Sequence, residues 1–369
     1  MSLDHYYTLG KSGLRVSRLA LGALTFGTDW GWGAEKDTAR TMFNTYVDAG
    51  GNLIDTADLY VNGVSEQWVG DFIRERGLRE RMVLATKFSF NLDPTNPNSG
   101  GNGRKNILRA VDASLKRLGT DYIDLYQLHT WDRLTPVDEV MRTFDDLVRA
   151  GKVRHVGLSN TPSWYASRGQ TLAELRGYEP ISSIQLSYSM VERSIESEFA
   201  DLATQYGVGI MAWSPLGGGM LSGKYKPSET GQHGEGRLQM LSHPAFAKFS
   251  ERNFAIVAEV ERVAKEIGRS MSQVALNWVA NRPGVAVVLV GATKQAQLDD
   301  NLQALDFVIP AQLVARLDAV SAVPPTFPYT YFQPEIQTQI AGSHPVGDKP
   351  SSYAPPVVIR GDPPATENE

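Results

Sequence analysis

The 369-residue chain contains no cysteine, and this absence restricts its chemistry more than any other. Disulfide bonds, thiolate zinc sites, iron–sulfur clusters and a cysteine nucleophile are therefore excluded. The six histidines are scattered without ligand-like pairing, and the His-x-His pattern of metal-dependent barrel hydrolases is missing after the first strand. We therefore expect no metal centre. A chain without thiols also fits a reducing cytoplasm, where we expect this protein to reside.

Long apolar runs and long runs of one charge are missing as well. The longest apolar stretches, such as VAVVLV at 285–290, fall far short of the roughly 20 residues that a membrane helix needs. The N-terminus lacks the charged and apolar regions of a signal peptide. The net charge is -5, and Lys and Arg form no basic block. We expect a soluble protein that binds neither nucleic acid nor membranes.

What the chain does contain is a repeated alternation of short β-rich runs with amphipathic stretches. Residues 104–118 and 136–150 have helical spacing, and Pro136 and Gly151 flank the second of them as expected for a helix. Eight β/α units predict an α/β fold, a (β/α)8 TIM barrel. A doubly wound sheet in two domains is the alternative, but no GxGxxG follows the first strand. The strands are expected at 19–22, 51–55, 82–87, 123–128, 153–158, 183–187, 208–213 and 286–290.

Three segments depart from this alternation. An N-terminal hairpin is expected at about 5–18, around a Gly-Lys-Ser-Gly turn. A long Gly/Ser-rich loop, 214–250, follows the seventh strand and is typical of a functional loop. The barrel domain is expected to span 1–320. Ten of the twenty prolines lie in 321–369, which predicts an irregular tail that packs in part near Phe327–Phe332 and is mobile beyond about 340.

Four polar side chains, Asp55, Tyr60, Lys87 and His129, lie at or just beyond the ends of apolar runs. Taken singly, each has a plain structural interpretation: a rim tyrosine, a solvated lysine, a helix-capping aspartate, a hydrogen-bonded histidine. The carboxyl ends of parallel strands, however, share one face, where catalytic groups collect. A phenol, an ammonium, a carboxylate and an imidazole at one barrel mouth predict a proton-transfer site.

From residue 6 to about 320 the chain resembles the aldo-keto reductase family. The resemblance is strongest to the branch of the aryl-alcohol dehydrogenases and the potassium-channel β subunits. The motifs that carry it are GNLIDTADLYVNGVSEQWVG at 51–70, LATK at 84–87, YIDLYQLH at 122–129, GKVRHVGLSN at 151–160, WSPLGGGMLSGKY at 213–225 and VLVGATKQAQLDDN at 288–301.

The resemblance implies that Asp55, Tyr60, Lys87 and His129 form a catalytic tetrad. Tyr60 would protonate the alkoxide in reduction and act as the base in oxidation. The ammonium of Lys87 would lower the pKa of Tyr60, and Asp55 would neutralise Lys87. His129 would donate a hydrogen bond to the substrate carbonyl. Channel β subunits have Asn in place of His129, so the histidine favours turnover over a purely regulatory role.

The resemblance also implies a nicotinamide dinucleotide as the hydride source. Ser159, Asn160 and Gln185 would hold its carboxamide, and Trp213 would stack on its ring. The successive glycines 217–219 allow backbone N–H groups to approach its pyrophosphate. Further contacts are expected from Gly22, Ala23 and Asp55, from Ser214, Pro215, Leu216, Gly217, Gly218 and Gly219, from Lys224 and Arg237, and from Gly291, Thr293, Lys294, Gln297, Asp300 and Asn301.

The start of the helix after the last strand bears on the choice between NADP and NAD. By resemblance, residues 291–294 would bind an adenosine 2′-phosphate at a helix N-terminus. Many family members have Lys and Arg where this chain has Gly291 and Gln297. Thr293 and Lys294 could still bind the phosphate, so we expect NADP(H) rather than NAD(H).

Aromatic residues in the mouth loops predict the substrate pocket. Trp30, Trp32, Phe88 and Trp131 would form a wall that suits an aryl or planar carbonyl compound, although rim packing alone could explain each. The tail around Phe327–Phe332 could cover the mouth as a lid. We expect NADP-dependent, reversible reduction of aldehydes or ketones, and the alternative is a nicotinamide-bound regulatory protein like the channel β subunits. The oligomeric state is left open.

Overall fold

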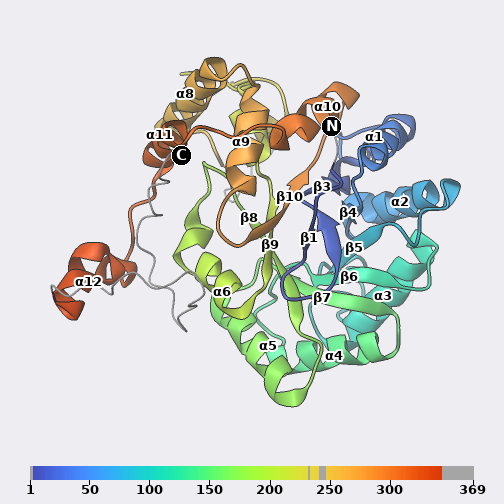
Figure 1. Ribbon diagram of the computed structural model, residues 1–369. Helices are drawn as coiled ribbons and strands as arrows, with labels where there is room; N and C mark the ends of the chain where they lie inside the picture. Colours follow the sequence, from blue (N-terminus) through green and yellow to red (C-terminus); the bar gives the residue numbers. More distant parts are fainter. Residues whose placement is uncertain (1–2, 232, 241–246, 343–369) are drawn as a thin grey trace. The chain divides into compact units, whose positions relative to one another are not determined.

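The computed structural model describes residues 3–231, 233–240 and 247–342. Its centre is a closed barrel of parallel strands, in the order β10-β3-β4-β5-β6-β7-β8-β9, which Figure 1 shows inside a ring of helices. Because β10 pairs with β3, the sheet has no open edge. The fold is therefore a (β/α)8 barrel and not a doubly wound sheet. The strands are β3 (Leu19–Gly22), β4 (Leu53–Asp55), β5 (Val83–Phe88), β6 (Ile123–Leu128), β7 (Val153–Ser159), β8 (Ile181–Ser187), β9 (Gly209–Trp213) and β10 (Val285–Val290).

The barrel strands are apolar because both of their faces are covered. All six residues of β5 are buried, as expected for a parallel strand between a barrel core and a helical layer. Alternation divides its side chains between the two faces. Lys87 points into the barrel, where it contacts Asp55 of β4. Phe88, the next residue, packs outward against Phe144 of a surrounding helix.

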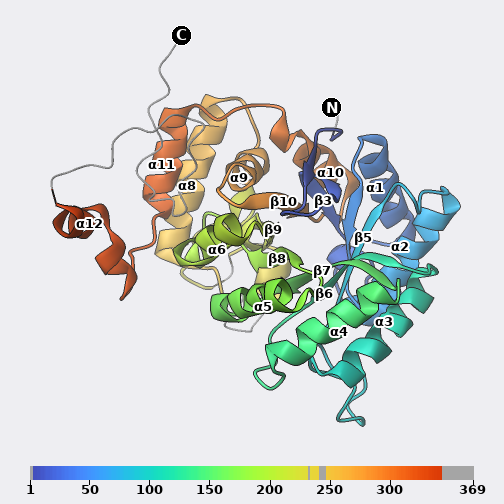
Figure 2. The ribbon, with the colours of Figure 1, turned by 60° about the horizontal axis from the view of Figure 1, so that its bottom comes forward.

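The helices that surround the barrel follow the predicted alternation (Figures 1 and 2). The predicted helix 104–118 is confirmed, and it ends at Gly119, whose φ of 64° suits a glycine cap. Helices α8 and α11 lie side by side in both views. The helices of the barrel are α1 (Lys36–Asp48), α2 (Val64–Glu75), α3 (Arg104–Leu118), α4 (Val137–Arg149), α5 (Ser163–Arg176), α6 (Phe199–Tyr206), α7 (Arg237–Met240), α8 (Glu251–Glu266), α9 (Met271–Ala280), α10 (Gln295–Asn301) and α11 (Ala311–Ser321).

The predicted N-terminal hairpin is present and closes one end of the barrel. Strands β1 (Tyr6–Thr8) and β2 (Arg15–Ser17) pair antiparallel. Leu9 and Val16 are fully buried, in a cluster with Leu53 and Val83, which begin barrel strands. The hairpin therefore covers the opening at the amino ends of the strands, while the polar residues of the predicted site lie at the carboxyl ends.

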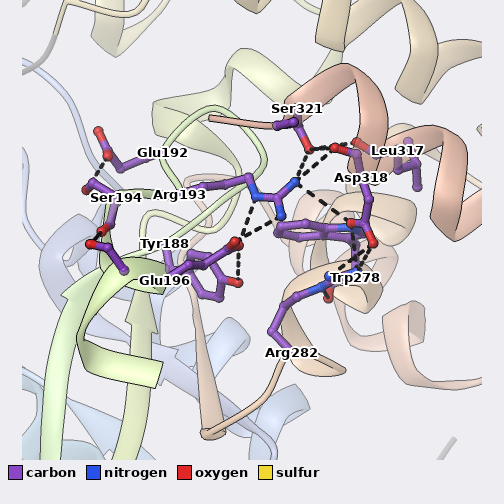
Figure 3. A network of polar contacts seen from close by, with 12 residues as sticks. Tyr188, Glu192, Arg193, Ser194, Glu196, Trp278, Arg282, Leu317, Asp318 and Ser321 are labelled. Atoms are coloured by element: carbon purple, nitrogen blue, oxygen red, sulfur yellow. Dashed lines mark hydrogen bonds and ion pairs between the residues drawn. The ribbon is translucent and has the colours of Figure 1, made fainter. Parts of the chain in front are cut away.

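A network of polar contacts joins the last barrel helix, α11, to the loop after β8 (Figure 3). The guanidinium of Arg193 donates to both carboxylate oxygens of Glu196, at 2.8 and 2.9 Å. It also donates to the Asp318 carbonyl at 3.1 Å and to Ser321 Oγ at 2.8 Å. The buried Trp278 of α9 lies against Arg193 and donates to the Asp318 carboxylate at 2.8 Å. The loop after β8, helix α9 and helix α11 are thus held together by one network.

The chain divides into two units, residues 1–322 and residues 323–369. The described part of the second unit contains a 3₁₀ turn, Tyr329–Phe332, and helix α12 (Pro334–Ala341). The proline count did not predict this helix, but Pro334 occupies its first turn, where proline is tolerated. The segment beyond residue 342, where mobility was expected, lies outside the described residues. Among the described residues, no helix is both long and apolar enough to cross a membrane.

Candidate active site

The four predicted catalytic side chains meet at the carboxyl ends of β4, β5 and β6. The ammonium of Lys87 lies 2.6 Å from Asp55 Oδ2 and 3.2 Å from the Tyr60 hydroxyl. It also donates to the Thr56 carbonyl at 2.7 Å, and its side chain is fully buried. The rings of Tyr60 and His129 are 5.8 Å apart. The structure thus gathers into one group residues that are up to 74 positions apart in the sequence.

Two amide side chains complete the environment of the buried carboxylate. Asp55 Oδ1 accepts hydrogen bonds from Gln185 at 2.9 Å and from Gln127 at 3.2 Å. Gln185 was expected to hold a cofactor carboxamide, and here its amide lies on Asp55. Gln127 was not predicted. Strand alternation could have identified it, because it lies two residues before His129 and so shares its face of the chain.

Burial and charge set the protonation of Tyr60 and Lys87. Burial raises the pKa of the Tyr60 phenol, and the neighbouring Lys87 ammonium opposes this without outweighing it. The predicted lowering of that pKa is therefore corrected: the lysine acts in the expected direction, but burial dominates. Burial would lower the pKa of Lys87, yet its interactions with Asp55 and Tyr60 raise it. At neutral pH the site holds a neutral phenol beside a charged ammonium that is ion-paired with Asp55.

His129 is a neutral imidazole in this environment. Burial, assisted by the charge of Lys87, holds the pKa of His129 well below its usual value. Its Nδ1 atom is buried without a hydrogen-bond partner among the described residues. A neutral imidazole carries one N–H donor, so His129 can donate one hydrogen bond to a substrate oxygen.

The predicted carboxamide-binding residues connect the histidine to Trp213. The Trp213 indole donates to Asn160 Oδ1 at 3.2 Å. The amide of Asn160 donates to the His129 carbonyl and to Ser159 Oγ, both at 3.0 Å. Asn160 and Ser214 both have left-handed backbones, with φ of 49° and 52°. These turns place the ends of β7 and β9 beside the tetrad.

The loop after β9 has the form expected of an anion-binding segment. It begins with Ser214, Pro215 and Leu216, and Gly217, Gly218 and Gly219 follow with φ of 57°, 70° and 95°. The φ of 95° at Gly219 favours glycine, and a Cβ atom there would lie 2.7 Å from Cε of Lys224, so a larger residue would displace this lysine.

Arg237 adds a second cation to this loop. It is partly buried, its guanidinium lies over the Trp32 ring at 5.2 Å, and its Nε atom is buried without a hydrogen-bond partner among the described residues. Burial lowers the pKa of Arg237, against the opposing effect of Tyr60. A desolvated cation with an unused donor fits the phosphate oxygens of a dinucleotide.

A side chain of α10 itself, Gln297, caps the start of this helix. Gln297 Oε1 accepts hydrogen bonds from the backbone N–H groups of Thr293 and Lys294, at 3.0 and 3.3 Å. These two backbone N–H groups are therefore already partnered within the chain. Asp300 accepts hydrogen bonds from Ser270 and Gln273, which join α10 to α9.

The remaining predicted cofactor-binding residues lie at the ends of β3, β10 and α10. Gly22 ends β3, and the carbonyl of the following Ala23 accepts a hydrogen bond from Ser65 Oγ at 2.7 Å. Gly291 follows β10, the neighbour of β3 in the barrel. Asn301 is buried at the end of α10.

One predicted pocket residue is corrected. Phe88 is fully buried and stacks on Tyr126 at 5.0 Å between the barrel and the helices. It cannot line a pocket at the mouth, because it points to the opposite face from Lys87. Phe90, two residues on, is 41% exposed, and its ring meets the edge of His129 at 5.1 Å. Phe90 therefore lies beside the tetrad histidine, and strand alternation could have indicated this position.

The three predicted tryptophans differ in their surroundings. Trp30 and Trp32 lie 5.8 Å apart, and Trp32 carries the Arg237 guanidinium. Trp131 packs instead against Trp164 and Tyr165 of α5. The position of Trp32 beside Arg237 supports its predicted role in the substrate pocket. Trp131 has the contacts of a packing residue.

A TIM barrel with a buried aspartate–lysine–tyrosine chain and a neighbouring histidine at its carboxyl face is consistent with an oxidoreductase. The family model described as "Aldo/keto reductase family" matches residues 18–322. The chain belongs to the aldo-keto reductase family.

Relatives with different assigned roles are similar over most of the chain. An "Uncharacterized oxidoreductase YrpG" of Bacillus subtilis is 34% identical, covering 85% of this chain and 95% of its own. A "Probable voltage-gated potassium channel subunit beta" of Oryza sativa subsp. japonica is 34% identical, with 86% and 96% covered. An "Aryl-alcohol dehydrogenase [NADP(+)]" of Phanerodontia chrysosporium is 30% identical, with 87% and 86% covered. These relatives include both an enzyme and a channel subunit.

Proposed function

We propose that this protein reduces aldehydes or ketones reversibly to alcohols, with NADP(H) rather than NAD(H) as cofactor and Tyr60 as general acid and base. The observation that carries the proposal is the buried hydrogen-bonded chain from Asp55 through Lys87 to the Tyr60 hydroxyl. Membership of the aldo-keto reductase family and similarity to an NADP-dependent aryl-alcohol dehydrogenase support the same reaction.

In this proposal each side chain has one task. The bound dinucleotide supplies the hydride that the carbonyl carbon accepts. Tyr60 transfers its phenolic proton to the carbonyl oxygen, which yields the alcohol and leaves a phenolate. The Lys87 ammonium, 3.2 Å away, stabilises that phenolate, and Asp55 keeps the ammonium in place. The N–H of neutral His129 donates a hydrogen bond to the same carbonyl oxygen. Oxidation of an alcohol runs through these steps in reverse.

The chain has suitable groups to hold the dinucleotide. Gly217–Gly219, Lys224 and Arg237 would bind its phosphates, a role supported by the unpartnered Nε atom of Arg237. Trp213 would stack on the nicotinamide ring. Ser159, Asn160 and Gln185 would hold the carboxamide, and Lys294 the 2′-phosphate. An aromatic neighbourhood of Trp32 and Phe90 favours aryl aldehydes among the candidate substrates.

The first test is oxidation of NADPH, followed at 340 nm, with a panel of aryl and alkyl aldehydes and ketones. We expect turnover, with a lower KM for NADPH than for NADH. Tyr60→Phe removes the proton donor and should lower kcat by about 10²–10⁴-fold. Tyr178→Phe, on a loop before β8, is the matched control and should keep wild-type activity. The proposal fails if no carbonyl compound is reduced or if Tyr60→Phe retains full turnover.

The alternative is a nicotinamide-bound regulatory subunit, which the similarity to a channel β subunit supports. In that case the protein would bind NADPH tightly, which quenching of tryptophan fluorescence would detect. Its turnover of every carbonyl compound would be the same in the wild type and in Tyr60→Phe. Binding and turnover measured on the same preparation separate the two functions.

A further inference from the structure

A second group of buried charges lies behind the loop that presents Tyr60. Asp58 is 2% exposed and Glu66, in α2, is fully buried. Arg117, in α3, donates from Nε to Glu66 Oε2 at 2.6 Å. None of these residues belongs to the proposed tetrad, and ionisable groups so deeply buried are costly unless each is compensated.

Both carboxylate oxygens of Glu66 have hydrogen-bond partners, whereas one oxygen of Asp58 has none among the described residues. Besides Arg117, Glu66 accepts a hydrogen bond from Thr86 Oγ1 at 2.6 Å. Asp58 Oδ1 is buried without a hydrogen-bond partner among the described residues. The groups that act on its carboxyl are Glu66 of α2, Arg117 and Arg109 of α3, Tyr126 of β6 and the backbone N–H of Leu59. Burial, then the charge of Glu66, raises the pKa of Asp58 to about 7, against the attraction of Arg117.

The backbone of Asp58 is tied directly to the tetrad. Its N–H donates to the carbonyl of Lys87 at 3.1 Å, and the N–H of Tyr60 donates to the Ala57 carbonyl at 3.1 Å. The two residues after Tyr60, Val61 and Asn62, have left-handed backbones with φ of 48° and 53°. This conformation is unfavourable for a β-branched residue and persists only where surrounding contacts enforce it.

The same charge group supplies part of that enforcement. Gly63 lies so close to Arg117 that a Cβ atom there would be 2.6 Å from Arg117 Cδ. Arg117 in turn is held by Glu66. The loop that carries Tyr60 is therefore packed directly against a member of this buried charge group.

We propose that Asp58 is a positioning residue for Tyr60: its protonated carboxyl keeps the loop in the conformation that places the Tyr60 hydroxyl beside Lys87, and its ionisation releases the loop. Ionisation adds a second negative charge beside Glu66 in a buried site, and the strained backbone at Val61 can relax in response. The inference rests on the proposed function for its effect on catalysis, because Tyr60 is the proton donor there.

Tyr60 and His129 titrate away from neutral pH. Burial holds the pKa of His129 well below its usual value and raises that of Tyr60 above its ordinary value. A loss of activity centred near pH 7 therefore belongs to Asp58 and not to these two residues.

The kinetic test compares kcat and KM from pH 5.5 to 9 for an aryl aldehyde and NADPH. In the wild type, kcat should fall about tenfold between pH 6 and pH 8, as expected for one essential protonated group, with a smaller change in KM. Asp58→Asn mimics the protonated acid and should keep the high kcat without this fall. Asp121→Asn, which changes an exposed acid before β6, is the matched control and should keep the wild-type profile.

Hydrogen exchange of residues 57–64 tests the loop without requiring turnover. After correction for the intrinsic rate, protection in the wild type and in Asp121→Asn should fall about tenfold between pH 6 and pH 8, and in Asp58→Asn it should stay constant. If protection does not change with pH in the wild type, the positioning role is wrong, whatever the protein's activity. If protection changes but Asp58→Asn keeps the wild-type kinetic profile, the loop does not control Tyr60 and the proposal is overturned. If no carbonyl compound is reduced, the proposed function fails, and the exchange comparison still decides the proposal on the loop.

Discussion

At the scale of single residues, the site works by compensating charges that burial makes costly. Asp55 accepts hydrogen bonds from Lys87, Gln127 and Gln185, so both of its oxygens are satisfied at nearly zero exposure. Lys87 donates three hydrogen bonds, which is the capacity of an ammonium. Tyr60 is left as the neutral member with a transferable proton. Asp58 differs, because its Oδ1 atom has no hydrogen-bond partner among the described residues. Burial is therefore offset by hydrogen bonds at Asp55 more fully than at Asp58.

The raised pKa of Asp58 predicts that the stability of the protein depends on pH. The pKa of Asp58 is about 7 in the folded protein, above the ordinary value of 3.8. The folded state therefore binds more protons than the unfolded state between about pH 4 and pH 7, and the free energy of unfolding should fall as the pH rises through that window. Urea unfolding of wild type and Asp58→Asn at pH 5 and pH 8 measures this. The substitution should be more stabilising at pH 8 than at pH 5, and an equal effect at both would contradict the prediction.

At the scale of elements, the loop after β8 and helix α11 hold each other through Arg193. Its guanidinium satisfies Glu196, the Asp318 carbonyl and Ser321 together, while Arg282 binds the Asp318 carboxylate at 2.9 Å. Because these partners are only partly exposed, water replaces Arg193 poorly when it is removed.

Arg193→Ala should therefore lower the free energy of unfolding by about 2–4 kcal/mol. Arg142→Ala changes an exposed arginine of α4 and should stay within about 0.5 kcal/mol of the wild type. Urea unfolding followed by circular dichroism measures both. Equal stabilities for the two variants would show that the network in Figure 3 contributes nothing net.

At the scale of the whole molecule, the barrel has a closed end and a catalytic end. The hairpin fills the amino end with Leu9 and Val16, and the proposed reaction takes place at the carboxyl end. Residues 1–322 have their own core, while residues 323–369 form a separate unit. A lid role for this second unit remains a prediction.

Truncation after Ala322 tests the lid. We expect the remaining barrel to unfold at nearly the same temperature, because its core and the Arg193 network end at or before that residue. If the tail covers the mouth, the KM for carbonyl substrates should rise several-fold while NADPH still binds. An unchanged KM in a stably folded truncated protein would rule the lid out.

Much of this architecture could be predicted from single residues and their spacing. The predicted strand at 123–128 matches β6, and the others agree with the structure to within two residues, because parallel strands buried on both faces leave continuous apolar runs. The meeting of Asp55, Lys87 and His129 also followed, since parallel strands end on one face. Phe88 was misplaced because its position beside Lys87 was considered without the alternation that turns it outward.

The sequence by itself determined the barrel, its hairpin and the residues that meet at its mouth, because strand length, burial and direction follow from local patterns. Only the tertiary structure decided how charges are balanced there. It raised the pKa of Tyr60 where lowering was expected, brought Gln127 to Asp55, and left Asp58 buried beside Glu66. The physical reason is that desolvation and charge interactions depend on distances between side chains from separate strands and helices, which no local pattern encodes.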